Sequence, residues 1–101
     1  MSKYNVTEEA DHDLHEIWEY IAQDDIEAAD RWDLRLRGAF EVLARNPGAG
    51  HSRRDLTDTS VLFWPLSAYL IIYRTLGDHV EILAVTQGAR DIPSFLRQRA
   101  H

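Results

Sequence analysis

Cysteine is absent from this 101-residue sequence, and lysine occurs only once, at Lys3. Without cysteine the chain has neither disulfides nor thiolate metal sites, which is typical of proteins in a reducing cytosol. The longest apolar runs hold about six residues, against the roughly 18 needed to cross a bilayer. The N-terminus also lacks the basic and apolar blocks of a signal peptide. We therefore expect a soluble, cytoplasmic protein without membrane partners.

Length and composition predict a single domain over residues 1–101, which buries roughly two-thirds of the surface of the unfolded chain. The net charge of -6 is uneven, because residues 1–50 carry 12 acidic and 5 basic side chains, whereas residues 51–101 carry 5 and 6. Net acidity repels phosphate backbones, so direct sequence-specific binding of nucleic acid is not expected. The second half nevertheless holds a candidate cationic patch of Arg53, Arg54, Arg74 and Arg90.

Two runs rich in Val, Ile, Leu and Tyr, at residues 68–74 and 79–87, flank a turn that contains Gly77. This pattern predicts a β-hairpin. Because the first run begins with six apolar residues, we expect it to be covered on both faces and to lie inside the sheet. A third strand is predicted at residues 61–64, with Pro65 in the turn that follows, since proline cannot donate to a ladder.

The first half predicts a short strand at residues 4–6 and then two amphipathic helices. Thr7 is a candidate N-cap for the first helix, and the segment Gln23-Asp24-Asp25 lies where it can cap the second. Apolar residues recur at helical spacing, and acidic residues including Asp13 occupy the other face. After the hairpin, residues 92–96 predict one final helical turn. The fold class is therefore α+β: a short N-terminal strand, a two-helix hairpin and a three-stranded antiparallel sheet.

This order of elements resembles the RelE/ParE superfamily of bacterial toxins from type II toxin–antitoxin systems, and the likeness covers nearly the whole chain. The residues that carry it are Ala10, Asp13-Leu14, Ile17, Tyr20-Ile21, Ala29, Asn46-Pro47-Gly48-Ala49-Gly50, Tyr69, Ile71-Ile72-Tyr73-Arg74 and Gly88-Ala89-Arg90-Asp91. Tyr69, residues 71–74 and residues 88–91 favour the ParE-like branch.

The resemblance implies a toxin that is held inactive by a cognate antitoxin, either ParD-like or another small antitoxin. ParE-like toxins trap DNA gyrase with cleaved DNA as protein inhibitors, without enzymatic activity or a cofactor. RelE-like toxins of similar fold instead cleave messenger RNA in the ribosome. The fold alone does not choose between these activities, and an inert binding module derived from a toxin is a third reading.

Cleavage of RNA needs a general base, a general acid and cations on the phosphate. Arg54, Tyr73, Arg74 and Arg90 supply only a partial ribonuclease set. Relatives often carry histidine just before the Gly-Ala-Arg-Asp segment, where this chain has Gln87, and glutamine does not exchange a proton near neutral pH. We therefore favour the non-catalytic inhibitor of gyrase, with the ribonuclease as the alternative.

The residues predicted to bind the target are Arg74, Gln87, Arg90 and Asp91. Structural roles compete with this reading, because Asp91 can cap the next helical turn and Arg74 can simply extend to water at the sheet rim.

The residues predicted to bind the antitoxin are Trp64, Tyr69, Arg53 and Arg54. An exposed aromatic pair beside Pro65 suits a segment that docks as an amphipathic helix or as an added strand. The two arginines can equally form a solvated loop pair.

His12 and His15 stand three residues apart on the first helix, and such a pair binds a metal only with a third ligand. Because this helical face is expected to be solvated, we predict no metal site. Trp18, Trp32 and Phe40 fit the predicted apolar stripes and are expected in the core.

Overall fold

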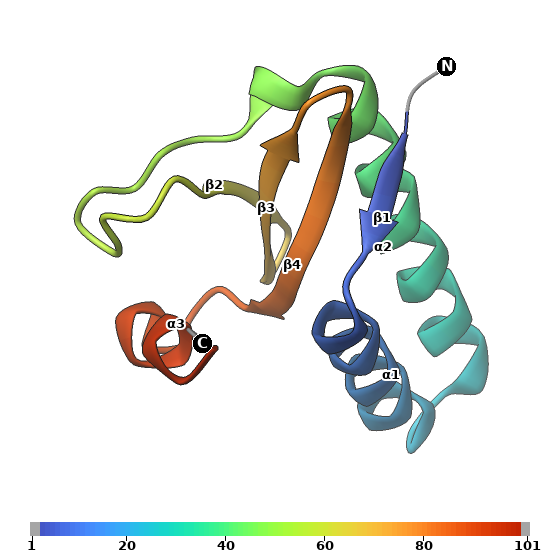
Figure 1. The fold of residues 1–101 in the computed structure, drawn as a ribbon. Coiled ribbons are helices and arrows are strands. Elements are labelled where there is room, and N and C mark those ends of the chain that lie inside the picture. Colours follow the sequence, from blue (N-terminus) through green and yellow to red (C-terminus); the bar gives the residue numbers. More distant parts are fainter. Residues whose placement is uncertain (1–2, 100–101) are drawn as a thin grey trace.

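The computed structural model describes residues 3–99, and Figure 1 shows a sheet with two long helices on one flank and a short helix on the other. The elements follow in the order β1 (Tyr4–Val6), α1 (Glu8–Ala22), α2 (Ile26–Arg45), the 3-10 turn η1 (Pro47–Ala49), β2 (Leu62–Leu66), β3 (Tyr69–Leu76), β4 (His79–Gln87) and α3 (Ile92–Arg99). The predicted α+β class is confirmed. No helix within residues 3–99 has the length and apolarity to cross a membrane.

The sheet has four strands in the order β1-β4-β3-β2. The three predicted strands β2, β3 and β4 are antiparallel, and β1 adds to the free edge of β4 in parallel. The inner position predicted for β3 is confirmed, since Ile71, Ile72 and Tyr73 are fully buried. A β-bulge interrupts the β3–β4 register, because Ile72 pairs with Ala84 while Tyr73 pairs with Ile82.

The two-helix hairpin forms because both helices have side-chain caps and one apolar stripe each. Thr7 accepts a hydrogen bond from Ala10 N at 3.1 Å, as predicted. Within the segment predicted to cap the second helix, Asp25 is the residue that does so, and it accepts from Ala28 N at 3.1 Å. The stripes pack on the sheet in the larger core, which consists of Ala10, Leu14, Leu36, Ala39, Phe40, Leu43, Ile71, Tyr73, Val80, Ile82 and Val85. Phe40 is fully buried as expected, whereas Trp18 and Trp32 are only half-buried.

The opposite face of the sheet carries a smaller core, which consists of Phe63, Leu70, Ile72, Ala84, Ile92 and Phe95. The last two residues belong to α3, so this helix covers the face that α1 and α2 leave open. The sequence predicted only one helical turn here, and this was wrong in length, because α3 continues to Arg99. Asp91 caps its first turn, since its carboxylate accepts from Ser94 N at 3.3 Å and from Ser94 Oγ at 2.8 Å.

Pro65 lies inside the edge strand β2 and not in the following turn, which corrects the predicted strand end. The backbone N–H and C=O of Phe63 point outward and exchange hydrogen bonds with His51 at 2.8 and 2.9 Å. The backbone N–H and C=O groups of residues two apart in a strand point to the same side. A residue other than proline at position 65 would therefore direct its N–H away from β3. The strand therefore loses no bond to β3, which is why proline is tolerated at a sheet edge.

Candidate functional site

The carboxyl end of β4 opens into a cleft of about 570 Å³, which we call the α1–α3 cleft. It lies between the exposed side of α1, the last residues of β4 and the inner side of α3. Its lining consists of His12, Asp13, Glu16, Ile17, Tyr20, Tyr69, Val85, Thr86, Gln87, Arg90, Phe95, Gln98 and Arg99. Gln87 and Arg90, two of the predicted target-binding residues, thus share this cleft with Tyr69, which was predicted to bind the antitoxin.

Arg90 has an exposed guanidinium group with no carboxylate partner within residues 3–99. Its Cζ atom lies 4.9 Å from the centroid of the Phe95 ring, an arrangement in which the ring supports the cation without neutralising it. The backbone N–H of Arg90 donates to Gln87 O at 3.2 Å in the turn after β4. A positive charge is therefore presented to solvent at the mouth of the cleft, where it can meet an acidic or phosphate group of another molecule.

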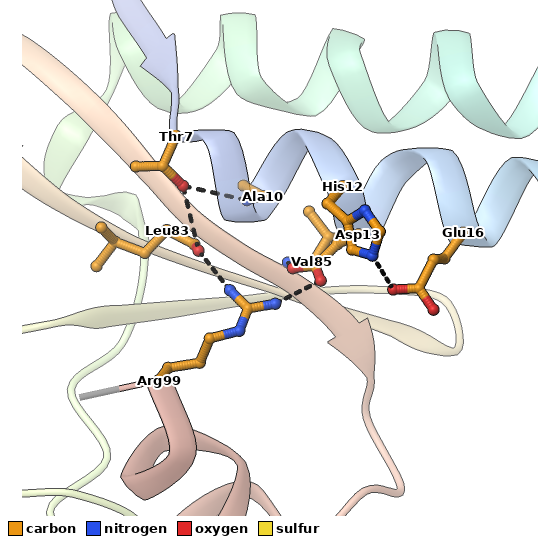
Figure 2. A network of polar contacts seen from close by, with 8 residues as sticks. All are labelled: Thr7, Ala10, His12, Asp13, Glu16, Leu83, Val85 and Arg99. Atoms are coloured by element: carbon orange, nitrogen blue, oxygen red, sulfur yellow. Dashed lines mark hydrogen bonds and ion pairs between the residues drawn. The ribbon is translucent and has the colours of Figure 1, made fainter. Parts of the chain in front are cut away.

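The floor of the cleft contains a buried carboxylate that the sequence did not predict. Asp13 was expected on the solvated face of α1, and this was wrong, because the residue is only 9% exposed. Its Oδ2 accepts from Val85 N at 3.0 Å, and its Oδ1 forms an ion pair with Arg99. Figure 2 shows Arg99 reaching from α3 to Asp13 on α1 and to the carbonyl of Leu83 on β4, where Nη1 donates at 3.1 Å.

Arg74 stands at the other end of the hairpin. It pairs with Glu81 in the β3–β4 register, whereas Gln87 pairs with Tyr69. Tyr69 and Arg74 are five positions apart along β3, which is roughly 17 Å at the rise of a strand. The four residues predicted to bind the target therefore do not form one group. Gln87, Arg90 and Asp91 belong to the carboxyl end of β4, and Arg74 lies apart from them.

Arg74 is already engaged in an ion pair on the sheet. Its Nε and Nη2 lie 2.8 and 2.7 Å from Oε1 of Glu81, whose Oε2 accepts from Asn5 at 3.3 Å. Partial burial by itself raises the pKa of Glu81, but the hydrogen bonds from Arg74 and Asn5 outweigh it, and the pKa lies below its usual value. Arg74 therefore has a structural role, but this role is an ion pair with Glu81 and not merely extension to water at the sheet rim.

Tyr73 lies in the larger core, and the structure places it out of reach of any bound phosphate. Its hydroxyl donates to Pro47 O at 2.8 Å and accepts from Gly50 N at 2.8 Å. Burial raises the pKa of Tyr73, although the hydrogen bond from Gly50 lowers it, so the phenol stays protonated near neutral pH. The proposed ribonuclease set is not assembled, since Arg74 and Arg90 stand at opposite ends of the hairpin.

The residues predicted to bind the antitoxin are likewise divided. Trp64 and Tyr69 are half-buried on the helix-covered side of the sheet, and the ring of Tyr69 lies 5.2 Å from that of Trp32 in an edge-to-face contact. Arg53 and Arg54 lie in the long loop before β2. Arg53 forms two hydrogen bonds with Asp55 at 2.9 and 2.7 Å.

Arg54 has no hydrogen-bond or ion-pair partner within the described part of the chain. It lines a small cleft of about 230 Å³ together with Thr75, the neighbour of Arg74 in β3. Arg54 thus belongs to the same end of the sheet as Arg74, away from Tyr69 and Arg90.

The two histidines of α1 are paired with carboxylates of their own helix. Nε2 of His12 lies 2.9 Å from Oε1 of Glu16, and Nε2 of His15 lies 2.9 Å from Oε1 of Glu19. Residues 3–99 contain no group of three or more histidine, aspartate or glutamate side chains arranged to hold a metal ion.

The comparisons with known proteins agree with this architecture. The protein family described as "ParE toxin of type II toxin-antitoxin system, parDE" matches residues 4–92. The chain belongs to the ParE toxin family. The predicted membership in the RelE/ParE superfamily, within its ParE branch, is thereby confirmed.

Two known proteins are similar to this chain, one in sequence and one in fold. Over 83 residues the chain is 37% identical to the protein named "Putative toxin Y4kP" of Sinorhizobium fredii (strain NBRC 101917 / NGR234), with 82% of this chain and 84% of the relative covered. A solved structure titled "Chromosomal ParDE TA system from P. aeruginosa" matches with a TM-score of 0.70 at 22% identity, covering 86% of this chain and 96% of that one. The second likeness concerns the fold alone.

Proposed function

We propose that this ParE-family chain inhibits DNA gyrase in the cytoplasm as a binding protein without catalysis, and that a cognate antitoxin prevents the resulting growth arrest. The observation that carries the proposal is the unpaired, exposed guanidinium of Arg90 at the mouth of the α1–α3 cleft. This arginine belongs to the Gly88–Asp91 segment on which the resemblance to ParE-like toxins rests. Gln87 beside it adds an amide that donates and accepts hydrogen bonds.

The non-catalytic reading is supported by Gln87, which shares the α1–α3 cleft with Arg90, and by Tyr73, which lies in the core. The amide of Gln87 acts neither as a general acid nor as a general base near neutral pH, and the Tyr73 phenol is hydrogen-bonded inside the core. General acid–base catalysis needs a titrating group within hydrogen-bond reach of the reacting atom. Gln87 and Tyr73 therefore do not supply a general acid or base beside Arg90, which supports binding of a macromolecule over bond cleavage.

We propose further that the antitoxin docks as an amphipathic helix against the half-buried aromatic side chains Trp64 and Tyr69. Addition of a strand to β2 is disfavoured, because His51 already occupies the outward groups of Phe63 and Pro65 has no N–H to donate. Arg54 at the far end of β2 offers an unpaired cation to an acidic side chain of such a segment.

A gyrase assay with the purified chain tests the proposed function. We expect supercoiling to stop and cleaved DNA to accumulate on gyrase as the toxin is titrated, and addition of the antitoxin to restore supercoiling. Unchanged supercoiling at saturating toxin would contradict the proposal. Mapping the ends of ribosome-bound transcripts after induction tests the ribonuclease alternative, since a gyrase inhibitor leaves those ends intact. Harmless expression in the absence of antitoxin would instead favour an inert binding module.

A further inference from the structure

Asp13 is the one charged residue that is buried among residues 3–99. A carboxylate in such a place is costly unless it is paired and hydrogen-bonded. Both of its oxygens are engaged: Val85 N donates to Oδ2 and Arg99 pairs with Oδ1. Arg99 therefore supplies the positive charge that offsets this buried carboxylate.

Arg99 ties the last turn of α3 to two other elements. Besides its ion pair with Asp13 on α1, it donates to the carbonyl of Leu83 on β4 at 3.1 Å. Leu83 is the residue skipped by the β-bulge, since its neighbours Ala84 and Ile82 pair with consecutive residues of β3. In Figure 2 the guanidinium lies between the Asp13 carboxylate and this carbonyl. The bulge thus turns a backbone acceptor toward α3.

The guanidinium groups of Arg99 and Arg90 both contact the ring of Phe95. Cζ of Arg99 lies 4.7 Å from the centroid of the Phe95 ring, and Cζ of Arg90 lies 4.9 Å from it. Two like charges on one ring repel each other, and Asp13 offsets this repulsion because it neutralises Arg99. The Phe95 residue is 7% exposed and packs in the smaller core, so the seating of α3 decides where the ring meets the two cations.

We propose that Asp13 and Arg99 are a positioning pair for Arg90. The pair holds the last turn of α3 against α1 and β4, keeps the Phe95 ring in place and so presents the Arg90 guanidinium at the mouth of the α1–α3 cleft. Its effect on the target rests on the proposed function, whereas the placement of Arg90 is a property of the toxin alone. The two claims are therefore tested separately.

The placement is tested by NMR on the isolated toxin. The Phe95 ring current should shift the Arg90 side-chain protons away from their solvent-exposed positions in the wild type. We expect this shift to be largely lost in Asp13→Asn and in Arg99→Gln, and to be partly restored in Arg99→Lys, which keeps the charge opposite Asp13. Arg97→Gln is the matched control, because Arg97 lies on the same helix but donates only to Ser94 Oγ. Circular dichroism verifies that each variant is folded.

The consequence for function is measured as inhibition of gyrase supercoiling by the same variants. We expect Asp13→Asn and Arg99→Gln to raise the half-inhibitory toxin concentration by about tenfold, the value of one weakened charge-assisted contact. Arg97→Gln should stay within about twofold of the wild type. An Arg90 side-chain shift that is unchanged in both variants would overturn the positioning claim. If the wild type does not inhibit gyrase, the proposed function fails while the NMR comparison still decides the claim about Arg90.

Discussion

The Gly50 backbone N–H donates a hydrogen bond of 2.8 Å to the hydroxyl of Tyr73, a residue 23 positions further along the chain. The contact is so close that a Cβ atom on Gly50 would lie 2.5 Å from the Tyr73 oxygen. The hydroxyl also donates to Pro47 O, so one buried phenol fixes both ends of the Pro47–Gly50 segment to the centre of the sheet. This segment therefore requires glycine at position 50 because of packing, not because of its backbone angles.

Substitution of Gly50 by alanine should destabilise the fold by about 1–3 kcal/mol, because the added methyl group overpacks against the Tyr73 ring. Gly38 provides the matched control, since it lies on the exposed side of α2 with nothing within 4 Å of an added Cβ. Gly38→Ala should stabilise the protein by about 0.5–1 kcal/mol through its higher helix propensity. Urea unfolding measures both changes. Equal stability of Gly50→Ala and the wild type would show that the contact is not tight.

Removal of the Tyr73 hydroxyl should also cost stability. Tyr73→Phe keeps the buried ring but removes two part-buried hydrogen bonds, from Gly50 N–H and to Pro47 O, and each such bond contributes about 0.5–1.5 kcal/mol. We expect a lower urea midpoint with an unchanged m-value, since the compactness of the chain does not change. The variant should leave the target contact intact, because Tyr73 is remote from the surface that presents Arg90. Loss of toxicity without loss of stability would instead revive a catalytic role for the phenol.

The ion pair between Arg74 and Glu81 predicts a stability that depends on pH. The pKa of Glu81 is lower in the folded chain than its usual value. Such a carboxyl stabilises the fold above its unfolded pKa, and the contribution is lost as the pH falls through the folded pKa. The urea midpoint should therefore fall between about pH 6 and about pH 3, less steeply in Glu81→Gln than in the wild type. Glu41→Gln on the exposed face of α2 should follow the wild type, and an identical slope for all three would contradict this role of Glu81.

The proposed docking of the antitoxin against Trp64 and Tyr69 predicts that Tyr69 contributes to the affinity for the antitoxin. Tyr69→Leu preserves an apolar side chain at the edge of the core but removes the ring that contacts Trp32. We expect the affinity for the antitoxin to fall by at least about tenfold, as for an aromatic residue at the centre of an interface. Leu34→Ala is the control, because Leu34 is 71% exposed on the outer side of α2. Titration calorimetry measures the affinity of both variants for the antitoxin. A larger loss of affinity from Leu34→Ala would indicate that the antitoxin binds to α2 instead.

The sequence was sufficient to predict the helical hairpin, its two side-chain caps and the inner position of β3. These features depend on local signals, namely the side chain of Thr7, the polar segment at residues 23–25 and the unbroken apolar run in β3. The pairing of β1 with β4 was not predicted. It is a parallel pairing between residues some 76 positions apart, and a strand of three residues is too short to show such a pairing in its sequence pattern. Family membership followed from the order of many weak motifs, none of which was specific alone.

Asp13 shows why the candidate site was only partly predictable. Its spacing from Ala10 and Ile17 places it on the inner side of α1, yet its charge led to the expectation of a solvated position. The compensating groups lie 72 and 86 positions away, at Val85 and Arg99, and become visible only in three dimensions. Gln87 and Arg90 lie in one cleft because Gln87 ends β4 and Arg90 belongs to the turn that follows, and their contact with the target stays a prediction. Arg74 was added to them from its motif, although the length of the hairpin separates it from the cleft.

Gyrase supercoiling titrated with the wild type, Arg90→Ala and Arg31→Ala tests the central claim most directly. Arg31 is the matched control, because it is exposed on α2 and has no ion pair within residues 3–99. The wild type and Arg31→Ala should stop supercoiling at similar concentrations, within about twofold. Arg90→Ala should need at least about tenfold more protein, since it loses a charge-assisted contact. Supercoiling that continues at saturating wild-type toxin, or equal potency of Arg90→Ala, would contradict the account.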